Sequence, residues 1–126
     1  MTDKKVLTIA ELIERADEIK GKKPKQGRVY LEDLDASVVF REVKASVLDD
    51  AMKMDGSDGD CYIIAECLVE PQLQNPELLK KYGVVGTVEL VKAILKPAAI
   101  RFLSRRIVDF SGYTGGTVGM VEEIKN

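Results

Sequence analysis

The acidic segment between Asp55 and Asp60 is the first place where side chains of this chain could bind a metal ion. In an EF-hand spacing that starts at Asp55, Ser57 would stand at the third position and Glu66 at the bidentate twelfth. The fifth position, however, is Gly59, which brings no side-chain oxygen, and the sixth is Asp60, where the loop needs glycine. We therefore expect no metal site here and interpret the segment as a turn between two helices.

The side chains that most often carry catalysis are missing or isolated in this sequence. Histidine, the commonest general base, is absent from the 126 residues, and no serine stands in a G-x-S-x-G motif. Cys61 and Cys67 would lie about 240° apart around a helix axis, so we expect reduced, buried thiols and no disulfide. The glycines between residues 112 and 119 lack the lysine of a phosphate-binding loop. We expect no catalytic residue, no cofactor and no metal, and therefore no enzyme.

The charge pattern argues against nucleic acid and membrane as partners. The 19 basic and 21 acidic residues give a net charge of −2, and the basic run at residues 20–25 has no interleaved aromatic side chains. We interpret this run as a solvated linker, with contact to phosphate as the alternative. The longest apolar run, residues 61–65, is far shorter than the roughly 20 residues of a membrane span.

Phe102 is the most informative candidate for binding a partner. A helix is expected over residues 97–111, and its apolar side chains at helical spacing form one face for the core: Ile100, Leu103, Ile107 and Phe110. Phe102 falls outside that face, on the charged side of the helix with Arg105. An aromatic residue in this position either packs under a neighbouring segment or contacts a partner, and the sequence leaves both interpretations open.

A helix over residues 8–20 is the first element that the sequence predicts. Thr8 and Glu11 match the capping-box pattern at its start, and Gly21 follows its end. Its apolar side chains share one stripe at helical spacing: Ile9, Leu12, Ile13, Ala16 and Ile19. Leu12 and Ile19 are therefore further candidates for contact with a partner.

The basic run after this helix contains Pro24 and Gly27 and predicts a hinge. We expect the whole chain, residues 1–126, to form a single domain. Within it, residues 1–27 would form the N-terminal helix and basic hinge, as a semi-detached arm, and residues 28–126 the hairpin and helical core.

The remaining elements are one β-hairpin followed by short helices. β-Branched and aromatic residues predict strands over residues 28–34 and 37–43, with a turn between them. Capping residues, prolines and glycines then predict five helices, over residues 47–54, 61–69, 76–82, 88–95 and 97–111. In this interpretation Ser46, Asn75 and Thr87 are N-caps. The expected fold is α+β, mostly helical, with one hairpin that packs on the helices.

The order of several short segments resembles one protein family. Residues 63–73, with the sequence IIAECLVEPQL, and residues 78–83, with LLKKYG, are similar to segments of the XkdN-like tail assembly chaperones of phages and prophages of Gram-positive bacteria. Residues 107–113, with IVDFSGY, and residues 121–126, with VEEIKN, add to the resemblance.

The resemblance implies a non-enzymatic role in building a phage tail. Proteins of this family are expected to bind the tape measure protein, a long helical chain that sets tail length, and to keep it soluble until tail tube subunits polymerise around it. The resemblance implies a location in the bacterial cytoplasm, absence from the mature virion, and contact with the tail tube protein or a second copy as further possibilities. Leu12, Ile19, Phe102 and Arg105 are then the candidate partner-binding residues.

Two other functions compete with this interpretation. The first is a structural head–tail connector or minor tail protein that stays in the virion, and the second is a host-directed regulator that binds nucleic acid through the basic linker.

Overall fold

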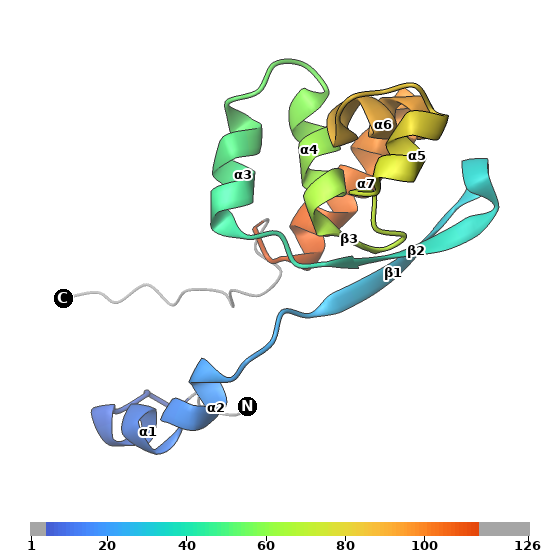
Figure 1. Ribbon diagram of the computed structural model, residues 1–126. Helices are drawn as coiled ribbons and strands as arrows, with labels where there is room; N and C mark the ends of the chain where they lie inside the picture. The colour runs from blue at the N-terminus through green and yellow to red at the C-terminus, as the bar shows by residue number, and fades with distance from the viewer. Residues whose placement is uncertain (1–4, 114–126) are drawn as a thin grey trace.

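The computed structural model describes residues 5–113, in which a three-stranded antiparallel sheet supports a layer of helices (Figure 1). Strand β1, Gln26–Leu31, pairs with β2, Ala36–Arg41, as the predicted hairpin, with Val29 opposite Val38. Alternate residues of both strands are buried toward the helices, as period-two side-chain patterning requires. The α+β class and the hairpin are therefore confirmed, although both strands end before their predicted limits.

The turn of the hairpin is a short 3₁₀ segment, Glu32–Leu34, followed by Asp35 in the left-handed region at φ 47°. Aspartate is among the few residues other than glycine that tolerate this conformation. The Tyr30 hydroxyl donates a hydrogen bond to the Asp35 carboxylate across the turn, and this bond raises the pKa of Tyr30.

Strand β3, Leu68–Glu70, was not predicted and corrects the expected helix over residues 61–69. The helix α4, Asp58–Cys67, ends one residue before β3, which pairs antiparallel with β2 and completes the order β1-β2-β3. A short apolar run is compatible with either a buried helix or a strand, so its periodicity could not locate this change.

The core lies between the sheet and five helices, with α4 at its centre. Six of the ten residues of α4 are buried, in agreement with its apolar character on nearly all sides. The other helices of this layer are α3 (Ala45–Met52), α5 (Pro76–Lys81), α6 (Thr87–Ile94) and α7 (Pro97–Phe110).

In the layer of helices, the predicted caps are correct at one helix and wrong at two. At α5 the Asn75 side chain accepts a hydrogen bond from the Leu78 amide at 3.0 Å, as expected of an N-cap followed by proline. Ser46 instead lies inside α3, whose N-cap is Lys44, and Thr87 is the first residue of α6 after Gly86. Neither of these N-caps makes a side-chain capping bond.

Two serines of α7 and its C-terminus tie this helix to the rest of the fold. Ser104 is buried and donates to the Asp60 carboxylate of α4 at 2.9 Å. The Ser111 hydroxyl accepts from the Val43 amide at 2.8 Å and donates to the Ile107 carbonyl at 2.7 Å. These bonds hold one face of α7 against α4 and the segment after β2. The opposite face of α7 is exposed.

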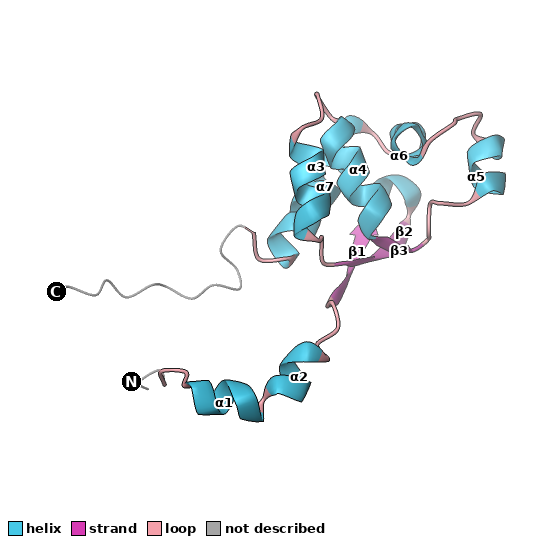
Figure 2. Cartoon of the chain, turned by 60° about the vertical axis from the view of Figure 1, so that its left-hand side comes forward, coloured by secondary structure: helices cyan, strands magenta, loops and turns pink. Residues whose placement is uncertain are grey.

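The N-terminal region forms two short helices, α1 (Ile9–Glu14) and α2 (Ala16–Lys20), where one helix was predicted. The break is at Arg15, whose ψ of 9° departs from helical geometry. Figures 1 and 2 show α1 and α2 away from the layer of helices, and no residue of either helix is buried. We call residues 5–25 the arm and residues 26–113 the body.

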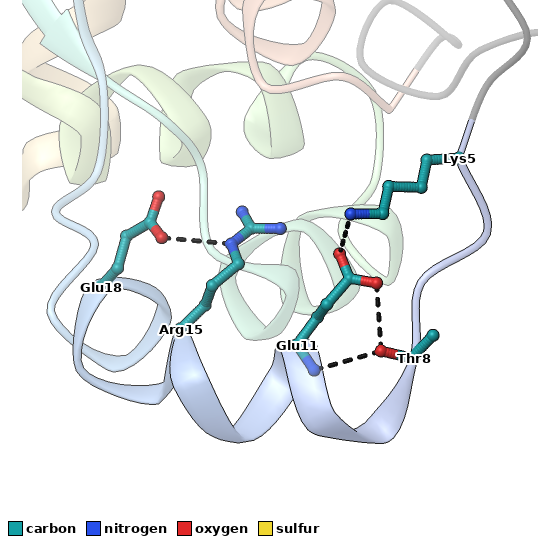
Figure 3. A network of polar contacts seen from close by, with 5 residues as sticks. All are labelled: Lys5, Thr8, Glu11, Arg15 and Glu18. Carbon is teal, nitrogen blue, oxygen red and sulfur yellow. Dashed lines mark hydrogen bonds and ion pairs between the residues drawn. The ribbon is translucent and has the colours of Figure 1, made fainter.

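The capping box at the start of α1 is present (Figure 3). The Glu11 amide donates to the Thr8 hydroxyl at 3.2 Å, and this hydroxyl donates to the Glu11 carboxylate at 3.0 Å. The Lys5 ammonium lies 3.2 Å from the same carboxylate, and together these contacts lower the pKa of Glu11. Arg15 bridges the break by donating to Glu18 at 3.1 Å.

Candidate partner-binding surface

The exposed face of α7 carries two of the four candidate residues. Leu103 on the core side is fully buried, whereas the neighbouring Phe102 is 49% exposed. Arg105 is exposed one turn further along. The structure therefore places Phe102 on the outside of the body, although the contacts that it makes with a partner stay a prediction. We call the face formed by Arg101, Phe102 and Arg105 the α7 surface.

Three shallow grooves border the α7 surface. The first, of about 570 Å³, lies between α7, α3 and α4 and is lined by Arg101, Arg105 and apolar side chains that include Met52. The second, of about 650 Å³, shares both arginines with the first and is also lined by Phe102 and Pro97. Neighbouring grooves thus share walls, and an extended helix could contact more than one of them.

The third groove, of about 410 Å³, connects the α7 surface to the hairpin. It is lined by Phe102 of α7 and by Tyr30 and Leu31 of β1. Phe102 therefore stands between the second and third grooves, where one aromatic side chain would contact a ligand that enters either of them. Tyr30 is itself half-exposed and extends the apolar area toward the outer strand of the sheet.

The α7 surface is basic. Helix α7 contains three arginines, Arg101, Arg105 and Arg106, and one aspartate, Asp109, which gives 3 − 1 = +2. The ion pairs Lys5–Glu11, Arg15–Glu18, Lys92–Asp58 and Lys96–Asp33, all among residues 5–113, do not include an arginine of α7.

The acidic segment examined for metal binding is engaged in contacts between helices. The Lys92 ammonium of α6 donates to Asp58, which raises the pKa of Lys92, and Asp60 accepts the bond from Ser104. Within the described part of the chain no three histidine, cysteine or acidic side chains gather as a metal site would require. The segment joins α3 to α4, as a turn between helices was expected to do.

The apolar stripe of the arm is exposed. Leu12 is 41% and Ile19 is 44% exposed, and Ile9 and Ile13 are more exposed still. Val6 and Leu7, which precede the predicted helix, extend the same apolar character toward the N-terminus. A solvent-exposed patch of apolar side chains is typical of a binding site for another polypeptide.

The structure does not bring the four candidate residues together. Leu12 and Ile19 lie on the arm, and Phe102 and Arg105 lie on α7 in the body, which are separate parts of the molecule in Figures 1 and 2. They form two separate exposed surfaces: the surface of the arm is apolar, and the α7 surface is aromatic and basic.

Sequence reasoning missed the methionines at the end of α3. Met52 is 76% exposed and Met54 is also exposed, and both line the first groove. Flexible thioether side chains adapt to apolar ligands of different shape. Their position at the end of a short helix, just before Gly56, was the available signal, but only the packing of α3 and α7 on α4 shows that they border the arginines.

The two thiols are free and buried, as predicted. Burial raises the pKa of Cys61, and it raises the pKa of Cys67 to about 11. Thiols of this kind are protonated at neutral pH and are poor nucleophiles. The glycine-rich stretch noted in the sequence lies outside the described residues from residue 114 on, as does the segment at residues 121–126.

No helix among the described residues is long and apolar enough to cross a membrane. Comparison with protein families gives one informative match: the model described as phage XkdN-like tail assembly chaperone protein aligns with residues 2–125. No curated protein and no solved structure matches the chain. The aligned range includes both the arm and the α7 surface.

Proposed function

The chain belongs to the phage XkdN-like tail assembly chaperone family, and from this premise we propose that it binds the tape measure protein and keeps it soluble until tail tube subunits polymerise around it. The observation that carries the proposal is the extent of the family match, which covers residues 2–125. Chaperones in general act by binding, and the proposed activity involves no covalent step.

The surfaces described above support this proposal in physical terms. A long helical client has apolar stripes that must be covered until assembly and released afterwards. Shallow grooves between short helices, bordered by Phe102 and by flexible methionines such as Met52, can cover such stripes with modest affinity. The exposed apolar side of the arm provides a second contact of the same kind.

We assign roles to the four candidate residues within this proposal. Phe102 would insert between apolar side chains of the client, and Arg105 would pair with a client carboxylate beside them. Leu12 and Ile19 would cover a neighbouring stretch of the client from the arm, with the basic linker at residues 22–25 as the hinge. The tail tube protein would then displace the chaperone from the client.

Such a chaperone would act in the cytoplasm of the bacterial host and would leave before the tail is complete. Protein analysis of purified phage particles tests this directly, together with affinity purification of the tagged chain from cells in which the phage assembles. We expect the tape measure protein to co-purify with the tagged chain and the chain to be missing from the particles. Its presence in the particles in fixed amount would instead establish a head–tail connector or minor tail protein.

A further inference from the structure

The first groove, of about 570 Å³ between α3, α4 and α7, lies where the chain leaves the described part of the structure. Along α7 it extends from Val108, near the end of the helix, to Arg101, near its start. Along α3 it extends from Leu48 to Met54, two residues after that helix. Apolar side chains of both helices line it, so it suits a segment of polypeptide that carries apolar side chains of its own.

The end of α7 brings the chain to this groove. The Gly112 amide donates to the Asp109 carbonyl at 3.0 Å, and the Tyr113 amide donates to the Val108 carbonyl at 3.3 Å. With Gly112 at φ 86°, these two bonds form a Schellman motif, which ends a helix and turns the chain. The backbone of Tyr113 is thereby held against Val108, which lines the groove.

The same end of α7 is tied to the start of α3. The Ser111 hydroxyl accepts from the Val43 amide, and the Tyr113 hydroxyl donates to the Val43 carbonyl at 3.5 Å. Val43 comes two residues before α3, and Figure 1 shows the start of α3 and the end of α7 close to each other beside the sheet. The sequence after Tyr113 therefore begins at one end of the groove.

The sequence that follows has the composition and the length to occupy the groove. Residues 114–126, which we call the C-terminal segment, contain four apolar side chains within seven residues: Val118, Met120, Val121 and Ile124. The stretch of α7 from Val108 to Arg101 measures about 11 Å, and 13 residues span about 20 Å as a helix and about 43 Å when extended. Because the segment is joined to the chain at one end of the groove, its effective concentration there is on the order of millimolar, more than a separate chain usually reaches.

We propose that the C-terminal segment folds back along α7 and docks in the first groove of its own chain, with its four apolar side chains against Met52 and Val108. Met52, which is largely exposed in the structure, gains an apolar partner in this arrangement. A docked segment covers part of the surface assigned above to the client, so it competes with the client there. This competition rests on the proposed function, whereas the docking does not.

Paramagnetic NMR on the full chain tests the docking without any tape measure protein, so its outcome is independent of the proposed function. A nitroxide label on a Lys125→Cys variant marks the C-terminal segment. Cys61 and Cys67 are buried and should stay unlabelled. Amide signals that keep their positions in the spectrum of the labelled variant show that the fold is unchanged.

We expect the amide signals of Leu48 and Met52 to fall below about half of their intensity with the reduced, diamagnetic label, because the segment is docked for most of the time. The signals of Lys80 and Lys81, on the exposed side of α5 and outside the groove, should keep their intensity.

Val121→Ser with Ile124→Ser, made in the labelled variant, removes apolar side chains from the segment and should restore the signal of Met52. Thr114→Ser with Thr117→Ser is the matched control in the same segment and should leave the loss as it is. An undiminished signal of Met52, or the same loss with and without the two apolar side chains, would overturn the proposal. Loss of signal in a mixture of labelled chain with unlabelled, ¹⁵N-enriched chain would also overturn it, because the contact would then join two copies.

Discussion

Phe102 and Leu103 are adjacent in sequence, yet their side chains lie on opposite sides of α7. Leu103 is fully buried between the sheet and the helices, and Phe102 is half-exposed between two grooves. Burial of a leucine contributes to folding through the apolar area removed from water, whereas a half-exposed aromatic side chain contributes little until a partner covers it. We therefore expect Leu103 to contribute mainly to the stability of the fold and Phe102 mainly to the binding of a partner.

We expect Phe102→Ser to weaken the complex with the tape measure protein by about tenfold while it changes the free energy of unfolding by less than about 0.5 kcal/mol. Leu103→Ala is the matched variant and should lose about 2–5 kcal/mol of stability because it leaves a cavity in the core. Chemical denaturation measures the stabilities and titration with the client measures the affinity. A large loss of stability in Phe102→Ser would show that its ring packs within the chain.

Cys67 gives a second prediction, on reactivity. Because burial raises the pKa of this thiol to about 11, only about one molecule in a thousand carries the thiolate at pH 8. The native protein should therefore react slowly with a thiol reagent at pH 8, and the rate should keep rising with pH beyond 9. After unfolding in guanidinium both cysteines should react at the rate of free thiols. Rapid reaction of two thiols in the native state would contradict the burial of Cys61 and Cys67.

Helical spacing predicted the residue positions on α7 well because they depend on one element. The periodicity of residues 97–111 separated Phe102 from the core face, and the structure confirms that Ile100, Leu103 and Ile107 are buried. The position of Met52 in the same groove as Arg105 was beyond such reasoning, since it depends on how α3 and α7 both pack on α4.

At the scale of elements, local sequence signals located helices such as α5, whereas strand β3 depends on pairing with a strand that is distant in sequence. Asn75, Pro76 and Gly83 set the limits of α5 as predicted, because a cap, a proline and a glycine at φ 66° act within a few residues. Strand β3 forms because Leu68 lies opposite Phe40 of β2, a partner 28 residues away. No pattern within the apolar run itself contains that information.

Helices α3 and α4 approach each other so closely that their contact depends on Gly59. A Cβ at residue 59 would overlap the backbone carbonyl of Ala51, and backbone atoms cannot move aside as a side chain can. Gly59→Ala should therefore destabilise the protein by about 1–3 kcal/mol, although this exchange usually stabilises a helix by about 0.5–1 kcal/mol.

Thermal unfolding measures this effect, and Ser57→Ala is the control. Ser57 is the N-cap of α4 but makes no capping hydrogen bond, so its replacement should change stability by less than about 0.5 kcal/mol. An unchanged or raised melting temperature in Gly59→Ala would show that α3 and α4 are further apart than described.

At the scale of the whole molecule, the body contains the hydrophobic core and the arm lies outside it. The core is formed by β1–β3 and the helices of the body, and the arm contributes no buried residue to it. The sequence predicted the capping box and the apolar stripe of the arm, and the hinge stays a prediction. The break at Arg15 was not predicted because no proline or glycine marks it.

Removal of residues 1–24 tests whether the arm is independent of the body. This cut keeps Lys25, whose carbonyl accepts a hydrogen bond from the Glu42 amide at 3.1 Å beside the sheet. We expect the melting temperature to change by less than about 4 °C, equivalent to about 1 kcal/mol, since no core contact is removed. A larger fall would mean that the arm packs on the body and that residues 1–126 form one inseparable unit.

The central claim is that this chain keeps the tape measure protein soluble by covering its apolar stripes. Its most direct test is co-expression of the tape measure protein with the wild-type chain, with a Phe102→Ser/Arg105→Glu variant, or with the Lys80→Glu/Lys81→Glu control, followed by measurement of the soluble fraction. We predict that the wild type and the control raise the soluble fraction well above that of the tape measure protein alone, and that the α7 variant raises it much less. A tape measure protein that stays as insoluble with the wild-type chain as without it would contradict the account.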